Sequence, residues 1–144
     1  MLPQPDTEPV AGDRYRLRRT HRYEWAHGEG GRRQRYRLTV PAGYVYDGAS
    51  VPRWLWSVTG ILPDGLQREA ALLHDWLYEH RGAPPAPSYE RAGVRGWEAC
   101  AEVWTRGAAD RLFGRLMREA GVPKVRRRSA YLAVRAFGWL YWRG

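Results

Sequence analysis

The stretch Glu69-Ala-Ala-Leu-Leu-His-Asp-Trp-Leu-Tyr78 is the one around which the rest of the chain is organised. Apolar residues recur through and before it at helical spacing: Leu66, Ala70, Leu72, Leu73, Trp76 and Leu77. We therefore predict a helix over residues 66–80, ended by Gly82 and the prolines that follow it. Two adjacent titratable residues, His74 and Asp75, lie within this apolar helix.

The segment before this helix alternates apolar and charged residues, as half-buried antiparallel strands do. Residues 35–40, Arg-Tyr-Arg-Leu-Thr-Val, alternate strictly, and the glycines of 28–31 supply a turn. We take residues 13–50 as β-rich and residues 1–12 as a flexible arm. The alternation would place six arginines on one outer face: Arg14, Arg16, Arg18, Arg33, Arg35 and Arg37. Such a face can bind phosphate or simply meet solvent, and the solvated interpretation is favoured.

Two further helices are predicted, over residues 107–120 and 124–142, with Gly121 and Pro123 between them. One face of the last helix is expected to meet the core: Ala130, Ala133, Val134, Phe137, Leu140 and Tyr141. Another face is basic and aromatic: Arg128, Tyr131, Arg135 and Trp142. That face either lies on an anionic membrane or is the outer side of a packed helix, and the second interpretation is favoured.

The Pro-, Gly- and Arg-rich residues 83–105 are interpreted as an insertion within the helical part, residues 66–142. A short helix is expected inside this segment, from Trp97 to Trp104. The fold predicted for residues 13–144 is a single α+β domain. It has a small N-terminal antiparallel β-sheet followed by about three main helices.

The composition indicates which partners the protein could bind and in which compartment it is expected. The net charge of +9 favours anionic partners such as acidic lipid or nucleic acid. Cys100 is the one cysteine, so no intrachain disulfide can form, which fits a reducing compartment. No apolar run approaches the length of a membrane span, and the first residues do not resemble a signal peptide. We expect a cytoplasmic protein, or one that leaves a cell by lysis or inside a particle.

His74 and Asp110 are the candidate catalytic residues. A helical histidine can act as a general base when a carboxylate holds its other ring nitrogen. Asp110 lies in the predicted helix 107–120 beside apolar residues, where a buried carboxylate is costly without a partner. If the two helices pack antiparallel, Asp110 meets His74. A His-Asp pair on a helix is also common in proteins without any activity, so a purely structural role stays open.

Asp47, Gly48 and Asp75 are the candidate metal ligands. Asp75 lies about 100° around the helix from His74, so the two side chains have different neighbours. Two carboxylates and a carbonyl from a Gly-containing loop are the oxygen ligands that Ca²⁺ prefers. Such an ion would polarise an ester carbonyl while His74 activates water.

The order of three motifs resembles an uncharacterised family, a domain of unknown function, that is common in tailed-phage and prophage genomes. The motifs are Val40-Pro-Ala-Gly-Tyr-Val-Tyr-Asp-Gly-Ala-Ser-Val-Pro-Arg53, Ala70-Ala-Leu-Leu-His-Asp-Trp-Leu-Tyr78 and Ala109-Asp-Arg-Leu-Phe113, and Gly121-Val follows them. The resemblance covers about residues 34–138. It implies a bacteriophage or prophage source, and hence the host cytoplasm or the phage virion.

The same motifs resemble, more weakly, those of prokaryotic phospholipases A2: Asp47-Gly-Ala-Ser50, Ala70-Ala-x-x-His-Asp-x-x-Tyr78 and Ala109-Asp-x-x-Phe113. The resemblance implies that His74 activates water, that Asp110 orients His74, and that Asp47, Asp75 and a carbonyl near Gly48 hold Ca²⁺. Two cysteines of that family are Ala49 and Ala71 here, and the β-rich N-terminal third has no counterpart in it.

These patterns together favour a phage-encoded, calcium-dependent esterase that resembles phospholipase A2 and acts on an anionic lipid or envelope component. Trp54, Trp56 and Tyr78 are its candidate interface residues; the two tryptophans either pack in the core or form an apolar lip. One alternative is a non-enzymatic virion or assembly protein that contacts phage structural proteins and uses the polar residues as a scaffold. Another is a host-defence antagonist that binds an anionic ligand or nucleic acid through arginines, although no known nucleic-acid motif is present.

Overall fold

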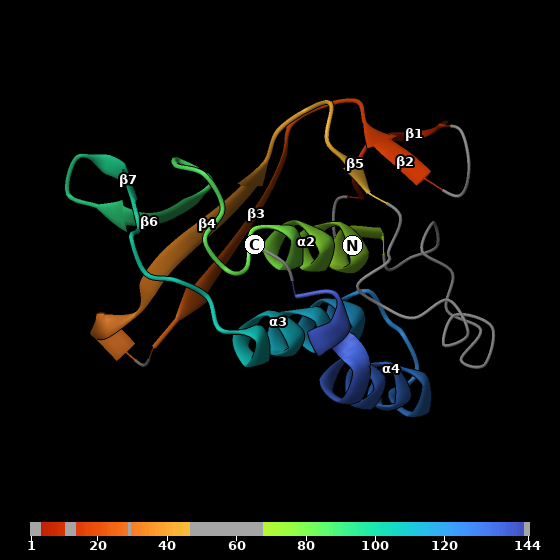
Figure 1. Ribbon diagram of the computed structural model, residues 1–144. Helices are drawn as coiled ribbons and strands as arrows, with labels where there is room; N and C mark the ends of the chain where they lie inside the picture. Colours follow the sequence, from red (N-terminus) through yellow and green to blue (C-terminus); the bar gives the residue numbers. More distant parts are fainter. Residues whose placement is uncertain (1–3, 11–13, 29, 47–67, 143–144) are drawn as a thin grey trace.

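The computed structural model describes residues 4–10, 14–28, 30–46 and 68–142 of the 144-residue chain (Figure 1). The predicted α+β fold is confirmed, because antiparallel strands occupy the N-terminal region and, among the described residues, three α-helices follow. None of the described helices has both the length and the apolar character needed to span a bilayer.

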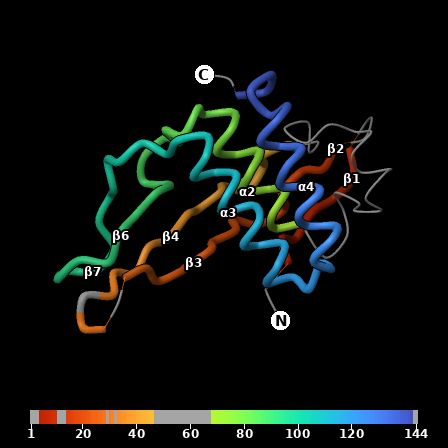
Figure 2. The backbone as a smooth tube through the Cα atoms, turned by 90° about the horizontal axis from the view of Figure 1, so that it is seen from below, coloured from red at the N-terminus to blue at the C-terminus, as the bar shows by residue number. Residues whose placement is uncertain are grey.

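The strands form two antiparallel sheets. The first has the order β1-β2-β5: β1 (Thr7–Val10), β2 (Arg14–Leu17) and β5 (Val45–Tyr46). The second has the order β3-β4-β6-β7: β3 (His21–His27), β4 (Gln34–Val40), β6 (Tyr89–Gly93) and β7 (Gly96–Ala99). A 3-10 turn, η1 (Gly30–Arg32), joins β3 to β4. Both views place the β6–β7 hairpin at the opposite end of the molecule from β1 and β2 (Figures 1 and 2).

The N-terminal segment differs from the expected flexible arm. Thr7–Val10 forms β1, which pairs with β2 from Thr7↔Leu17 to Val10↔Arg14. The pairing continues beyond the strands, since the N–H of Arg18 donates to the carbonyl of Asp6 at 2.7 Å. Residues 7–10 are regular because they pair with β2. The composition of the segment alone did not indicate this pairing.

The prediction of a helix from Trp97 to Trp104 is wrong. Gly96–Ala99 is strand β7, and the residues that follow it are not helical. Gly96 has φ +115°, a value that only glycine adopts readily, and this turns the chain back on β6. The hairpin then adds to β4, with Leu38 opposite Tyr89. Sheet pairing therefore outweighs the helical propensity of Glu98-Ala-Cys-Ala-Glu102. Whether residues 83–105 are an insertion stays a prediction.

Helix α2 (Arg68–Glu79) confirms the predicted central helix and is more deeply buried than its apolar stripe suggested. All ten residues from Glu69 to Tyr78 are buried, with α3 on one side and β4 and β5 on others (Figure 1). A helix that is covered all round has no outer face on which to place polar residues. The polar side chains of α2 must therefore find partners inside the protein.

The end of α2 is fixed by the chain that leads into α3. The N–H of Gly82 donates to the carbonyl of Leu77 and that of Arg81 to Tyr78, which closes the last turn as a Schellman motif. Arg81 has φ +50° and Gly82 φ +80°. The N–H of Trp104 donates to the carbonyl of Gly82 at 2.8 Å, so the start of α3 lies beside the end of α2.

The last two helices form where predicted, with one difference in how they face. They are α3 (Arg106–Glu119), α4 (Lys124–Phe137) and the 3-10 turn η2 (Gly138–Leu140). Ala130, Ala133 and Val134 are buried as expected, but Phe137 is 45% exposed and Leu140 is 51% exposed. The helix ends at Phe137, so its periodicity does not extend to Leu140. The basic and aromatic face is divided: Arg128 is exposed, whereas Arg135 reaches the buried Asp110 and Trp142, beyond α4, packs edge-on against Tyr78.

The six outer arginines do not form one surface, because they belong to different sheets. Several are neutralised by carboxylates: Arg16 by Glu8, Arg18 by Asp6, Arg35 by Glu24 and Arg37 by Glu90. Arg37 also lies 4.4 Å from the ring centroid of Trp97. These ion pairs leave less arginine charge available to bind phosphate, which agrees with the interpretation that these arginines meet solvent.

Candidate active site

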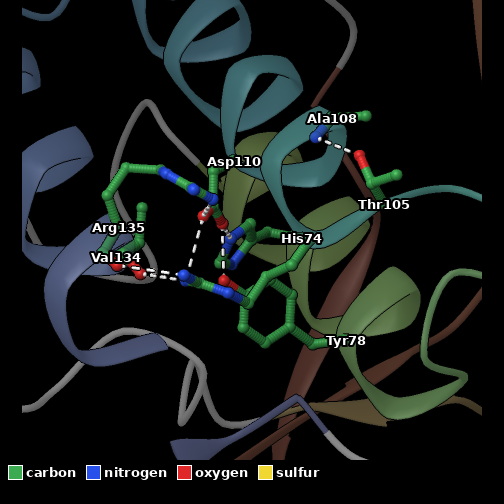
Figure 3. Close-up of polar contacts among 8 residues, drawn as sticks. His74, Tyr78, Thr105, Ala108, Asp110, Val134 and Arg135 are labelled. Atoms are coloured by element: carbon green, nitrogen blue, oxygen red, sulfur yellow. Dashed lines mark hydrogen bonds and ion pairs between the residues drawn. The ribbon is translucent and has the colours of Figure 1, made fainter. Parts of the chain in front are cut away.

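His74 on α2 and Asp110 on α3 meet in the core, as the antiparallel packing of two helices was expected to allow. The Nε2 atom of His74 lies 2.8 Å from Oδ1 of Asp110 (Figure 3). His74 is 1% exposed and Asp110 is 0% exposed. The His74 ring packs between Tyr78 and Phe113, with centroids at 4.1 and 4.7 Å. The two candidate catalytic residues therefore form one buried pair.

Asp110 has three further partners, which come from three helices. The Tyr78 hydroxyl of α2 donates to Oδ1 at 2.5 Å. Arg135 of α4 donates to Oδ2 at 2.9 Å, and Arg106 of α3 reaches the same oxygen at 3.3 Å (Figure 3). Both oxygens of the carboxylate are thus used, and its charge is compensated by two guanidinium groups.

Arg106 connects this network to the end of α4. Its guanidinium donates to the carbonyls of Val134 at 2.9 Å and Arg135 at 3.1 Å. These carbonyls belong to the last turn of α4, where the helix dipole favours a positive charge. Arg106 therefore fixes α4 against α3 while it neutralises Asp110.

The protonation states follow from burial and from these partners. Burial lowers the pKa of His74, Arg106 lowers it further, and Asp110 offsets only part of this effect. Burial alone would raise the pKa of Asp110, but hydrogen bonds from His74, Tyr78 and Arg135 lower it overall. At neutral pH the pair is therefore a neutral imidazole and a carboxylate. The carboxylate can only accept, so Nε2 carries the proton and Nδ1 carries the lone pair.

Only one part of the expected metal site lies within the described residues. Asp75 is 7% exposed, and its charge, after burial itself, contributes to raising the pKa of Tyr46. Asp75 therefore lies near Tyr46, which immediately precedes Asp47 in the sequence. Asp47 and Gly48 themselves lie outside the described residues. Within the described chain, no three His, Cys, Asp or Glu side chains gather as metal ligands.

The three candidate interface residues have different outcomes. Trp54 and Trp56 lie outside the described residues. Tyr78 is buried and donates to Asp110, so it belongs to the site and not to an exposed surface. Burial and the Asp110 carboxylate both raise the pKa of Tyr78, which keeps its hydroxyl protonated as a donor.

Sequence reasoning missed three members of the network: Tyr78 in this role, Arg106 and Arg135. Spacing could have found the first two. Tyr78 lies four residues after His74 and Arg106 four residues before Asp110, and residues four apart share one side of a helix. Arg135 gave no such signal, because only the packing of α4 brings it to Asp110.

A second buried His-carboxylate pair was also missed. Nε2 of His21, at the start of β3, lies 3.1 Å from Oε1 of Glu69 in the first turn of α2. Both side chains are buried, and the two atoms are within ion-pair distance without the alignment of a hydrogen bond. This contact ties the second sheet to α2 at the end remote from Tyr78.

Comparison with known proteins gives one family and one relative. The profile of a family described as "Protein of unknown function (DUF1353)" matches residues 27–134. The "Uncharacterized protein y4jT" of Sinorhizobium fredii (strain NBRC 101917 / NGR234) is 35% identical over 72 residues. That stretch is 45% of this chain and 21% of the relative, so the chain spans well under two thirds of the relative's length. No solved structure matches the chain.

Proposed function

The chain belongs to the DUF1353 family, and from its buried His74–Asp110 pair we propose that it is a hydrolase that cleaves a lipid ester. The observation that carries the proposal is the 2.8 Å contact between a neutral imidazole and an ionised carboxylate. With the proton on Nε2, the lone pair that can take up a proton is on Nδ1 of His74. The motif resemblance to prokaryotic phospholipases A2 supports the choice of an ester as the substrate.

The proposed reaction is the attack of water on the ester carbonyl. Nδ1 of His74 takes a proton from water as the water oxygen bonds to the carbonyl carbon. The carbon–oxygen bond to the alcohol then breaks, and the leaving oxygen takes the proton back from the imidazolium. The products are a carboxylic acid and an alcohol. Asp110 fixes the imidazole and stabilises its charged form, while Tyr78 and Arg135 hold Asp110 in place.

Calcium is the proposed cofactor. Asp75, Asp47 and the carbonyl of Gly48 would supply the oxygen ligands that this ion prefers. When bound, the ion would polarise the ester carbonyl. The position of Asp75 near Tyr46, the residue before Asp47, supports this set. His74 and Asp75 face different neighbours, which suits separate roles in proton transfer and metal binding.

An anionic membrane is the proposed partner, and the outer side of α4 supports it. Large apolar side chains are exposed along α4 and η2: Val125, Leu132, Phe137, Trp139 and Leu140. Cations flank them, including Lys124, Arg126 and Arg128, and no Asp or Glu occurs from residue 120 to the end of the sequence. Exposed apolar residues between cations are typical of helices that lie on anionic lipid.

A second candidate function is a non-enzymatic phage virion or assembly protein. The observation that favours it is that Asp110 joins α2, α3 and α4 through His74, Tyr78, Arg106 and Arg135, as a structural network would. The phage or prophage source, and with it the host cytoplasm or virion, rests on the resemblance in motif order. The further alternative, a binder of nucleic acid or another anionic ligand that antagonises host defence, draws less support, since several outer arginines are already paired.

Hydrolysis of phospholipid vesicles tests the proposal. Purified protein is mixed with vesicles of phosphatidylglycerol and phosphatidylcholine, with calcium or with a chelator, and released fatty acid is measured. We expect calcium-dependent release that His74→Gln abolishes. His80→Ala is the matched control, because the His80 side chain lies just beyond the same helix and, among the described residues, contacts the Trp76 carbonyl and ring and not Asp110. Folding of each variant is checked by circular dichroism and thermal unfolding.

The assay separates the two candidate functions. Calcium-dependent release that survives in His80→Ala and disappears in folded His74→Gln supports the hydrolase. Absence of release from the folded natural protein under every condition contradicts it and favours the structural network.

A further inference from the structure

A cavity lies between the four-stranded sheet and α3, on the opposite side of α3 from Asp110. Its volume is about 520 Å³. The lining combines aromatic and charged side chains: Trp25, His27, Tyr36, Tyr89, Glu102, Val103, Trp104, Thr105, Ala108, Arg111, Leu112 and Arg115. Ala108 and Leu112 are each two residues from Asp110, which places them about 200° around the helix from it. The cavity is therefore separate from the His74 site.

Aromatic rings form one wall of this cavity. Trp25 on β3 lies near-parallel to Tyr36 of β4, with centroids 5.6 Å apart and planes at 22°, and to Tyr89 of β6, at 6.2 Å and 3°. Trp104 meets Trp25 and Tyr89 at steeper angles, 62° and 59°. The rings thus present flat surfaces in two orientations, to which a planar apolar group can bind.

Two arginines of α3 form the other wall. Arg115 lies with its guanidinium carbon 5.6 Å from the Trp25 ring centroid, and its Nε is buried without an acceptor. Arg111, one turn earlier, is exposed. Within the described part of the chain neither arginine has a carboxylate at ion-pair distance, in contrast to Arg106 and Arg135. Their charges therefore favour an anion and disfavour a cation in this cavity.

The geometry points to a nucleotide as the ligand of this cavity, with its base against the aromatic rings and its phosphate at Arg111 and Arg115. Ala108 and Arg115 are seven residues apart on one side of α3, or about 10 Å along the helix. This length separates a base at one end from a phosphate at the other. Glu102 is the one carboxylate among the described lining residues. Burial raises the pKa of Tyr89 and the charge of Glu102 adds to this effect, so Glu102 lies near the Tyr89 ring, where it would accept from an amino group of the base.

Calorimetric titration with adenosine 5′-monophosphate tests this inference. The comparison ligands are adenosine, which lacks the phosphate, ribose 5-phosphate, which lacks the base, and inorganic phosphate, which lacks both the base and the ribose. We expect the nucleotide to bind at least tenfold more tightly than any of them, since base and phosphate contacts combine. A short single-stranded oligonucleotide distinguishes the sources: tighter binding than the monomer indicates a nucleic-acid strand, and weaker binding indicates a free nucleotide.

Variants locate the binding. Arg111→Ala and Arg115→Ala are each expected to weaken nucleotide binding at least tenfold. Arg118→Ala is the matched control, because Arg118 is exposed on the same helix and does not line the cavity. Arg111 is exposed, so its variant is expected to fold even if Arg115→Ala does not.

Three results would overturn the inference. The first is no binding of the nucleotide at millimolar concentration. The second is binding that Arg118→Ala weakens as much as Arg111→Ala does, which indicates general attraction to a basic protein. The third is equal binding of inorganic phosphate and nucleotide, which excludes a role for the rings. Binding that persists in His74→Gln is expected, because the cavity is independent of the proposed hydrolase site.

Discussion

His74 and Asp110, which are 36 residues apart in the sequence, lie 2.8 Å apart between α2 and α3, and neither is open to solvent. The contact joins a carboxylate of low pKa to an imidazole of low pKa. A pair in this state can serve as a base and its orienting group. It also binds two helices together, and the two roles have different consequences when either residue is changed.

Asp110→Asn should distinguish the role of Asp110 in orienting His74 from its role in stabilising the fold. The amide keeps the size of the side chain, but it removes the charge that selects the Nε2–H tautomer and supports the imidazolium. We expect at least a hundredfold loss of the proposed ester hydrolysis. The rate of fatty-acid release from vesicles is the measurement. A folded Asp110→Asn protein with the full natural rate would show that the carboxylate does not orient a base.

Asp110→Ala should be strongly destabilising. It leaves Arg106 and Arg135 without their buried anion and His74 without its acceptor. Breaking a buried ion pair on one side costs about 3–5 kcal/mol. The free energy of unfolding in urea is the measurement. Glu79→Ala, at the exposed end of α2, is the control and should change it by less than about 0.5 kcal/mol.

Stability should fall as the solution is acidified below pH 6.5. The folded-state pKa of His74 is lower than its ordinary value of 6.5, so between the two values the unfolded chain binds the extra proton. The free energy of unfolding therefore decreases as pH falls through this window. Asp110, whose folded pKa is below 3.8, adds a second loss under more acidic conditions.

Urea unfolding from pH 8 to pH 4, for the natural protein and His74→Gln, measures this effect. The part of the decrease that begins near pH 6.5 should be smaller in the variant. An identical pH dependence in both proteins would mean that His74 is not buried as a neutral imidazole.

Two substitutions at the end of α2 should change the free energy of unfolding in opposite directions. Arg81 adopts φ +50° at the position of a Schellman motif that glycine usually fills. Arg81→Gly should raise the free energy of unfolding by about 0.5–1 kcal/mol, since the left-handed conformation costs a non-glycine residue about 1–2 kcal/mol. Gly82→Ala should lower it, because its added Cβ would lie 1.9 Å from the carbonyl oxygen of Trp104. Thermal unfolding compares both with the natural protein.

The exposed apolar residues and cations on the outer side of α4 predict that the protein binds anionic membranes. Leu132→Asp should reduce sedimentation with phosphatidylglycerol vesicles by several-fold, since it places a negative charge among exposed apolar residues and cations. Val94→Asp is the matched control, because Val94 is fully exposed in the turn between β6 and β7, at the far end of the molecule from β1 and β2 (Figure 2). Equal loss in both variants would indicate a general effect of charge and no specific surface.

The sequence by itself determined the elements that depend on local periodicity. The spacing of Leu72, Leu73 and Leu77 was enough for α2, and glycines after α2 and α3 were enough for their ends. The strict alternation of residues 35–40 was enough for β4. The pairing of His74 with Asp110 was also within reach, since a carboxylate in an apolar helix requires a partner.

Apart from the His74–Asp110 pair, only the tertiary structure decided which distant residues meet. Gly96–Ala99 became a strand because β6 offered it a partner, and Phe137 became exposed because α4 turns Arg135 toward Asp110. Arg135 and the rings around Trp25 reach their sites from separate elements, at distances along the chain that no local pattern reports. Helices and turns arise from interactions within a few residues, whereas sheet pairing, helix rotation and buried charge networks depend on the packing of the whole chain.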